Sequence, residues 1–170
     1  MKKILLFTIV TIVFTSCVST GVVPIKGKYP DGPLRMKLDV PADTVWDRVI
    51  DLIADIGLNV RIVDKASGLV VSDPVSFTDK YSTEDRQGAV TDKGASIVTT
   101  RLNDENFKMV MKSVTASWNL RVKEVSPGKS TVSVLLYNID AKGVVDDYRH
   151  KGKSTGVFEK WVLDNLYQAK

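Results

Sequence analysis

Cysteine and histidine are almost absent from this sequence, since each occurs once in 170 residues, as Cys17 and His150. A single cysteine excludes an internal disulfide, so a folded domain must depend on its apolar core. A zinc site generally takes four ligands, and one histidine beside Asp146 and Asp147 is a poor set. We therefore expect no metal and no cofactor, and we predict that the segment around His150 is a solvated loop.

Motifs that mark catalytic sites are also missing. The sequence has no nucleophile elbow, no glycine-rich phosphate loop and no zinc-protease helix motif. Adjacent carboxylates occur at Glu84 and Asp85 and at Asp104 and Glu105. Acid–base catalysis by such a pair needs surroundings that separate the two pKa values, and polar loops ordinarily leave both groups solvated. We therefore expect that the protein is not an enzyme.

No apolar run is long enough to span a bilayer, which takes about 20 residues. The longest run covers residues 4–14, follows Lys2 and Lys3, and precedes small residues. This order is typical of a secretory signal peptide, which we predict over residues 1–16. The alternative is a short buried helix or strand at the N-terminus.

The sequence FTSC at residues 14–17 resembles the lipobox of bacterial lipoproteins, with Phe14 where leucine is usual. The resemblance implies that the Cys17 thiol carries a diacylglyceryl group and that cleavage occurs just before it. Two or more acyl chains anchor a protein firmly, because each buried methylene contributes about 0.8 kcal/mol. We therefore expect attachment to the membrane through lipid on Cys17, in the bacterial cell envelope and in the outer membrane facing the periplasm. The alternative is an unpartnered thiol.

Removal of residues 1–16 from the 170-residue chain leaves 154 residues, enough for one domain. The net charge of +4 falls to about +2, because Lys2 and Lys3 are removed. Positive and negative residues are interspersed along the chain, without the basic stripe of nucleic-acid-binding proteins, so no nucleic-acid partner is expected. Glycine and proline over residues 17–33 predict a flexible tether, followed by a single domain over residues 34–170.

The remaining pattern predicts the order β-α-β-β, a long loop, then β-β-β-α. Residues 34–40 alternate between apolar and polar as a strand does, whereas residues 42–56 carry an apolar helical stripe that ends at Gly57. Further strands are expected at residues 59–64, 69–72, 95–102, 116–123 and 131–139. Ser154 is suited to cap the last helix. The fold class is therefore α+β, with a single antiparallel sheet of about five to six strands packed on two helices.

Residues 73–94 are polar and aperiodic, so they are predicted to form a long loop that is either functional or disordered. Phe77 and Tyr81 are aromatic exceptions in this stretch, and Arg86 follows them. Loops carry function more often than scaffolds do, and these three residues are our candidates for contact with an envelope protein partner. The alternative is a mobile loop without a partner.

Trp46, Trp118 and Trp161 all fall on predicted apolar faces, so they are expected in the core. In the alternative interpretation, one of them lines a groove between the sheet and the C-terminal helix. Such a groove would bind a small apolar ligand.

The stretch VPADTVWDRVIDLIADIGLNVRIVDKASGLVVSD at residues 40–73 resembles the repeating unit of the BamC-like lipoproteins of the outer-membrane β-barrel assembly machinery. The matching positions are Pro41, Trp46, Gly57, Asp64 and Gly68. The resemblance implies a helix-grip fold and a role in protein–protein contact or assembly rather than catalysis. The ending STGVFEKWVLDNL is also similar to that of small single-domain lipoproteins of Bacteroides-like bacteria. A non-catalytic interaction or scaffold domain is thus the expected function, and binding of a small apolar ligand is the alternative.

Overall fold

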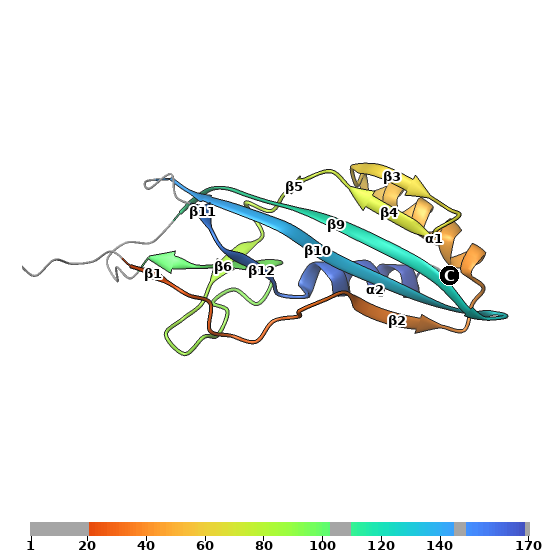
Figure 1. Ribbon diagram of the computed structural model, residues 1–170, viewed down its shortest axis with the longest axis horizontal. Helices are drawn as coiled ribbons and strands as arrows, with labels where there is room; N and C mark the ends of the chain where they lie inside the picture. The colour runs from red at the N-terminus through yellow and green to blue at the C-terminus, as the bar shows by residue number, and fades with distance from the viewer. Residues whose placement is uncertain (1–20, 103–109, 145–148, 169–170) are drawn as a thin grey trace, which may run out of the picture.

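Figure 1 shows the computed structural model of the protein, which describes residues 21–102, 110–144 and 149–168. A seven-stranded antiparallel sheet is built around the long hairpin of β9 (Met111–Ser126) and β10 (Lys129–Gly143). The other five strands pair with this hairpin or with each other: β2 (Leu34–Leu38) and β11 (Arg149–His150) on β10, β4 (Leu69–Ser72) and β5 (Val75–Ser76) on β9, and β3 (Val60–Asp64) on β4.

Two small sheets lie beside the main one, at the end of the molecule that carries the N-terminal described residues (Figure 1). β1 (Val22–Val23) pairs with β8 (Arg101–Leu102). β7 (Ile97–Thr99) lies between β6 (Tyr81–Thr83) and β12 (Gly152–Ser154), and the β6–β7 pair is parallel. The predicted α+β class and the mostly antiparallel sheet are confirmed. The predicted strand count of five to six is wrong, because the main sheet alone has seven.

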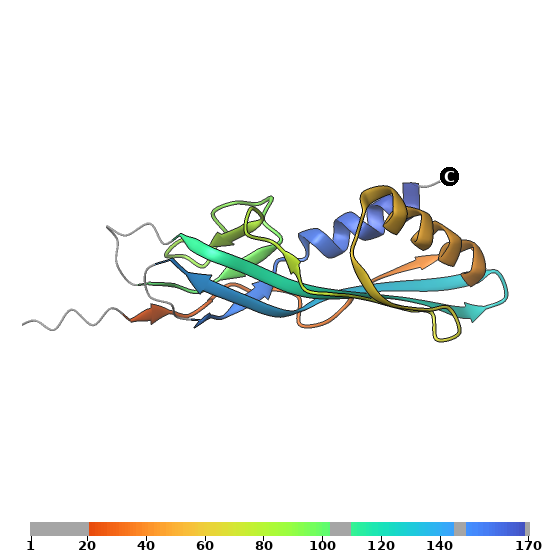
Figure 2. The same cartoon turned by 90° about the horizontal axis from the view of Figure 1, so that it is seen from above.

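Both helices lie on the same face of the main sheet, as Figure 2 shows. α1 (Ala42–Ile56) and α2 (Val157–Gln168) occupy the predicted positions. Gly57 ends α1 in the left-handed conformation at φ 63°, and the Leu58 N–H donates to the Ile53 carbonyl. The helical and period-two patterns therefore located these elements correctly.

The core lies between the helices and the inner face of β9, β10 and β4. The period-two pattern of β9 directs Trp118, Leu120 and Val122 toward the helices, and α2 contributes Val162 and Leu166. Each fully buried aliphatic or aromatic side chain contributes about 1.5–3 kcal/mol relative to an exposed one. Apolar burial therefore stabilises the fold without a disulfide.

The segment predicted as a long loop, residues 73–94, instead contains β5 and β6. The Ser82 side chain is buried in β6, where its hydroxyl lies 2.8 Å from that of Thr91. Where the structure describes the polar segment before the last helix, it also contains strands, because β10 extends to Gly143 and β11 and β12 lie within residues 149–154. Short polar strands of this kind pair with distant partners and have too few residues to show a period.

The described part of the predicted tether is bonded to the domain. Besides the β1–β8 pairing, the Glu84 carboxylate accepts hydrogen bonds from the Lys26 N–H at 2.7 Å, the Gly27 N–H at 2.8 Å and the Tyr29 hydroxyl at 2.8 Å. A Cβ at Gly27 would lie 2.6 Å from the Gly88 carbonyl, so glycine permits this close approach. Residues 1–16 and Cys17 lie outside the described residues.

The bonds to Glu84 also set its acidity. Burial raises the pKa of Glu84, but the hydrogen bonds from Lys26, Tyr29 and Gly27 outweigh burial and leave the pKa below its ordinary value. A carboxylate with a lowered pKa in the folded state stabilises that state above its unfolded pKa. This contribution is lost as the pH falls through the folded pKa.

We predict that Glu84→Gln releases residues 22–29 from the domain at neutral pH. In the glutamine side chain an NH2 group replaces one carboxylate oxygen, so a donor faces the backbone N–H groups that Glu84 accepts from. The loss of this interaction should destabilise the attachment of residues 22–29 by about 1–3 kcal/mol. Hydrogen exchange of these amides measures the effect. In the wild type their protection should decline as the pH falls through the lowered pKa of Glu84, whereas Glu84→Gln should show no such pH-dependent loss.

The control is Asp85→Asn, because Asp85 accepts bonds from the Gln87 and Ala89 N–H groups of its own turn rather than from residues 22–29. Equal protection of residues 22–29 in Glu84→Gln and the wild type would contradict this assignment.

Candidate functional site: a groove at the start of the last helix

A buried glutamate fixes the start of α2 to the main sheet. Glu159, on the first turn, accepts hydrogen bonds from the Leu136 N–H of β10 at 3.1 Å and from the Ser154 hydroxyl at 2.8 Å. The Ser154 oxygen in turn accepts from the Gly156 N–H at 3.0 Å. The prediction that Ser154 caps the helix is therefore wrong, because α2 begins at Val157, whose N–H donates to the Thr155 hydroxyl at 3.3 Å. These bonds leave the first turn of α2 with a set position and orientation.

The segments facing this turn are fixed by backbone bonds. The Phe77 N–H donates to the Val114 carbonyl of β9 at 2.7 Å, and the Ser96 N–H donates to the Lys80 carbonyl at 2.8 Å. The Thr155 hydroxyl donates to the Ala95 carbonyl at 2.6 Å, which joins these segments to the chain entering α2. Hydrogen bonds therefore hold the first turn of α2 and the segments that face it in fixed positions relative to one another.

A surface groove of about 460 Å³ opens at this place. We call it the Trp161 groove, and its lining consists of Phe77, Lys80, Gly94, Ser96, Val157, Phe158 and Trp161. The Phe77 and Phe158 rings meet edge to face, with centroids 5.5 Å apart, and the Phe158 and Trp161 centroids are 6.2 Å apart. Trp118 lies next to Phe158 in the core, at 6.2 Å between centroids. The groove is thus the exposed edge of an aromatic cluster that continues into the core.

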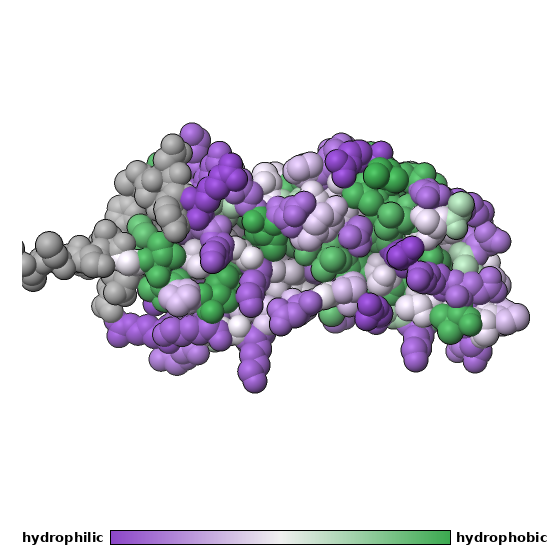
Figure 3. Space-filling model, viewed as in Figure 1, coloured by the Kyte–Doolittle hydropathy of each residue, from purple (hydrophilic) through white to green (hydrophobic). Residues whose placement is uncertain are grey.

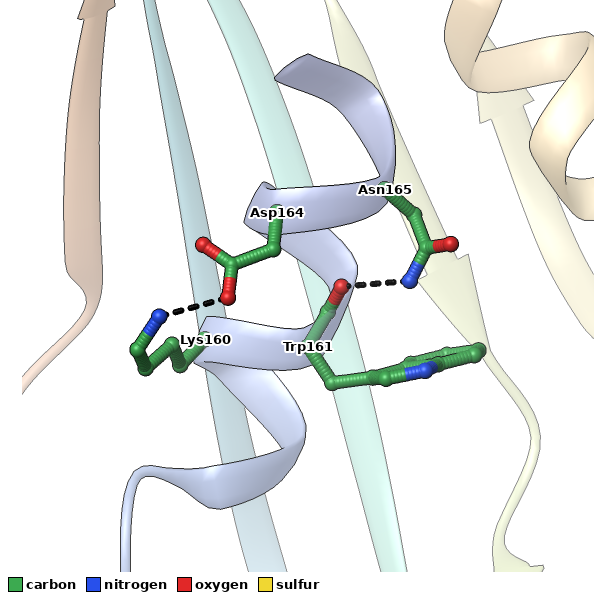
Figure 4. Close-up of polar contacts among 4 residues, drawn as sticks. All are labelled: Lys160, Trp161, Asp164 and Asn165. Carbon is green, nitrogen blue, oxygen red and sulfur yellow. Dashed lines mark hydrogen bonds and ion pairs between the residues drawn. The ribbon is translucent and has the colours of Figure 1, made fainter. Parts of the chain in front are cut away.

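Trp161 is the exposed member of this cluster. Its ring projects sideways from α2 in Figure 4, and 43 % of the residue remains accessible. The prediction that all three tryptophans lie in the core is therefore wrong for Trp161 and confirmed for Trp46 and Trp118. The apolar stripe of α2 is wider than the face that the sheet can cover, so Trp161 at its edge is left beside the groove.

The rim of the groove carries positive charge. Lys80 is exposed, and within the described parts of the chain its ammonium group forms no ion pair. Val157, at the positive end of the α2 dipole, lies on the opposite side of the lining. The groove therefore suits an apolar group whose surroundings are neutral or acidic.

The three predicted contact residues occupy different places. Phe77 lines the groove but is only 5 % exposed, and the Tyr81 hydroxyl accepts a bond from the Met111 N–H at 2.9 Å. Arg86 is exposed in the turn after Glu84, apart from the groove lining. The fold brings Phe77 together with Trp161 and leaves Tyr81 and Arg86 outside this site. Residues 73–94 have no periodic pattern, so the sequence could not indicate this arrangement.

The polar candidates from the sequence have structural partners. His150 is not in a solvated loop as predicted, because it lies in β11, is 3 % exposed and has its Nδ1 3.2 Å from the Thr100 hydroxyl. The Glu84 and Asp85 carboxylates accept the local bonds described above. The described residues contain no cluster of three or more histidine, cysteine or acidic side chains that could hold a metal. Asp104, Glu105, Asp146 and Asp147 lie outside the described residues.

Neither helix of the described chain has the length and apolar character needed to cross a bilayer. No protein-family model matches this chain, and no curated protein sequence matches it.

Proposed function

We propose that this protein is a lipid-anchored, non-catalytic domain of the bacterial cell envelope whose Trp161 groove binds an apolar side chain of another envelope protein. Cys17 is the proposed site of lipid attachment, and the outer membrane facing the periplasm is the proposed location. The role is that of an interaction or assembly scaffold.

The exposure of Trp161 is the observation that carries the proposal. Tryptophan is enriched among the residues that dominate binding energy, particularly where it borders a pocket that a partner can fill. Trp161 stands on a helix that Glu159 holds to β10, next to a buried Phe77–Phe158 pair. The groove is thus preorganised, so that a partner would pay little ordering entropy on binding.

The proposed fold type is the helix grip, in which a curved sheet holds a C-terminal helix. α2 lies against β10 and β2, and β10 shifts register between Tyr137 and Asp140, where Asn138 has φ 51°. Such an irregularity bends a strand. This arrangement, with the motif at residues 40–73, supports the proposed likeness to BamC-like lipoproteins.

The second candidate function is the binding of a small apolar ligand in the same groove. A volume of about 460 Å³ falls within the range of ligand pockets, roughly 300–1,000 Å³. The space beneath α2 is filled by Trp118, Leu120 and Leu166, which are all buried. Because the groove lies at the surface rather than beneath the helix, a protruding side chain fits it better than an enclosed ligand.

We predict that Trp161→Ala abolishes partner capture. In a pull-down from detergent-solubilised envelope of the native host, the wild type should enrich a defined protein at least about tenfold over Trp161→Ala, since truncating a binding hot spot costs 2 kcal/mol or more. Tyr167→Ala is the matched control, because Tyr167 is an exposed aromatic residue on the same helix at 67 % exposure.

Equal recovery by Trp161→Ala and the wild type would refute the protein partner. Native mass spectrometry of the same preparations tests the alternative. A bound apolar compound that Trp161→Ala loses would instead favour the ligand function.

A further inference from the structure

The main sheet has a second face, which neither helix covers. Figure 1 looks onto this face, with both helices behind the sheet, as the turned view in Figure 2 shows. In Figure 3 hydrophilic side chains lie over β2, β9 and β10 toward the β9–β10 turn, beside an apolar area over β3 and β4. The part of this face nearer the β9–β10 turn thus carries many hydrophilic side chains, with apolar ones among them.

Two columns of cations stand on this face. Arg35 and Lys37 alternate with inward residues on β2, and Arg121 and Lys123 do so on β9, and all four are exposed. None of the four forms an ion pair within the residues that the structure describes. Strand pairing therefore brings together on one surface four cations that come from two separate parts of the sequence.

The strand between the columns is β10, which presents hydroxyl groups. Ser133 pairs with Arg35 on one side and with Arg121 on the other, and Thr131 pairs in the same way with Lys37 and Lys123. The columns are two strand spacings apart, or about 10 Å, so each hydroxyl lies between two cations.

These columns border a groove of about 550 Å³ along the sheet. Its lining comprises Pro33, Arg35, Leu69, Asn119, Arg121, Lys123, Glu124, Val125, Thr131 and Ser133. Three cations and one carboxylate, Glu124, belong to this lining. Like charges held about 10 Å apart repel one another weakly, and an anion placed between them turns repulsion into attraction.

We propose that an extended acidic segment of a partner protein lies along β10 between the two cation columns, with carboxylates at every second residue. In an extended chain, side chains on one face recur about every 6.6–6.8 Å. The same spacing separates Arg35 from Lys37 and Arg121 from Lys123, because both pairs are two residues apart on strands. A carboxylate at each step would accept bonds from a cation pair and from Ser133 or Thr131.

Leu69 and Val125 at the groove margin would contact the apolar part of the segment. A bilayer surface is less suitable as a partner, because β1 lies at the end of the molecule opposite the β9–β10 turn (Figure 1). With Cys17 as the lipid anchor, the columns would lie toward the end of the domain that is farther from the membrane. This surface is separate from the Trp161 groove, so either proposal can fail while the other stands.

The test is fluorescence anisotropy with the full chain in detergent and a labelled peptide of alternating glutamate and threonine. We expect binding that weakens at least tenfold between 50 and 300 mM salt. The double variant Arg35→Glu with Arg121→Glu should raise the Kd at least tenfold. The uncharged pair Arg35→Gln with Arg121→Gln should also raise the Kd, but by less. Lys93→Glu with Lys151→Glu makes the same change in net charge elsewhere and should leave the Kd within about twofold.

A peptide of the same composition with its glutamates in one block should bind at least about fivefold more weakly than the alternating peptide. The proposal is overturned if the control pair weakens binding as much as the Arg35 and Arg121 pair, or if both peptides bind equally. It is also overturned if vesicles of anionic lipid or a sulfated polysaccharide bind in an Arg35- and Arg121-dependent manner while the alternating peptide does not.

Discussion

Replacing Gly68 with alanine is expected to lower the free energy of unfolding by about 2–5 kcal/mol. Gly68 has a φ of 65°, a left-handed conformation that costs alanine about 1–2 kcal/mol. A Cβ at this position would lie 2.0 Å from the Val122 carbonyl oxygen, which belongs to β9 and cannot move aside like a flexible side chain. The Val122 N–H also donates to the Gly68 carbonyl at 2.8 Å, so the displacement would separate β4 from β9.

Gly57→Ala is the matched control for this experiment. Gly57 has nearly the same φ, 63°, but no heavy atom lies within 4 Å of the Cβ that alanine would add. Gly57→Ala should therefore lower the free energy of unfolding only by the cost of holding alanine in the left-handed conformation, about 1–2 kcal/mol. Urea unfolding followed by tryptophan fluorescence measures both variants. Equal losses would mean that close approach to Val122 contributes nothing.

The Glu159→Leu variant should lose about 2–5 kcal/mol of stability. Leucine removes both acceptors and leaves the Leu136 N–H and the Ser154 hydroxyl without partners in the core, at about 1–3 kcal/mol for each buried group. Because these bonds hold the first turn of α2, the fluorescence of Trp161 should also shift toward that of a more exposed indole.

Glu159→Gln is the informative comparison, since its amide oxygen can still accept from Leu136 and its nitrogen can donate to Ser154. We expect it to retain most of the stability and all of the partner capture. If Glu159→Gln were as unstable as Glu159→Leu, the negative charge rather than hydrogen bonding would be the stabilising feature.

The two helices and the long hairpin could be predicted from the sequence because each is specified locally. Residues 42–56 carry a continuous helical stripe followed by Gly57, and residues 116–123 alternate strictly. β6, β11 and β12 could not be predicted, because each has two or three residues and depends on pairing with a segment distant in sequence. For the same reason the sequence predicts a loop at His150, whereas in the structure the pairing of β11 with β10 buries this residue.

The candidate site was predictable only in part. The sequence placed Trp161 on the apolar stripe of α2 and marked Phe77 as unusual in its segment, yet nothing in the sequence brings the two together. Glu159 has the sequence context of an ordinary surface residue of a first turn, and its burial appears only when β10 is placed beneath it. The cation columns likewise depend on register, since Arg35 and Arg121 become neighbours only through Ser133.

Site-specific photocrosslinking from position 161 tests the central claim most directly. A photoreactive phenylalanine derivative replaces Trp161 in one full-length variant and Tyr167 in another, and both are irradiated in intact cells of the native host. The proposed function predicts a discrete adduct with one envelope protein from position 161 and none from position 167. Equal adducts from both positions, or irradiation products without a protein partner at position 161, would contradict the claim that the Trp161 groove is a protein-binding site.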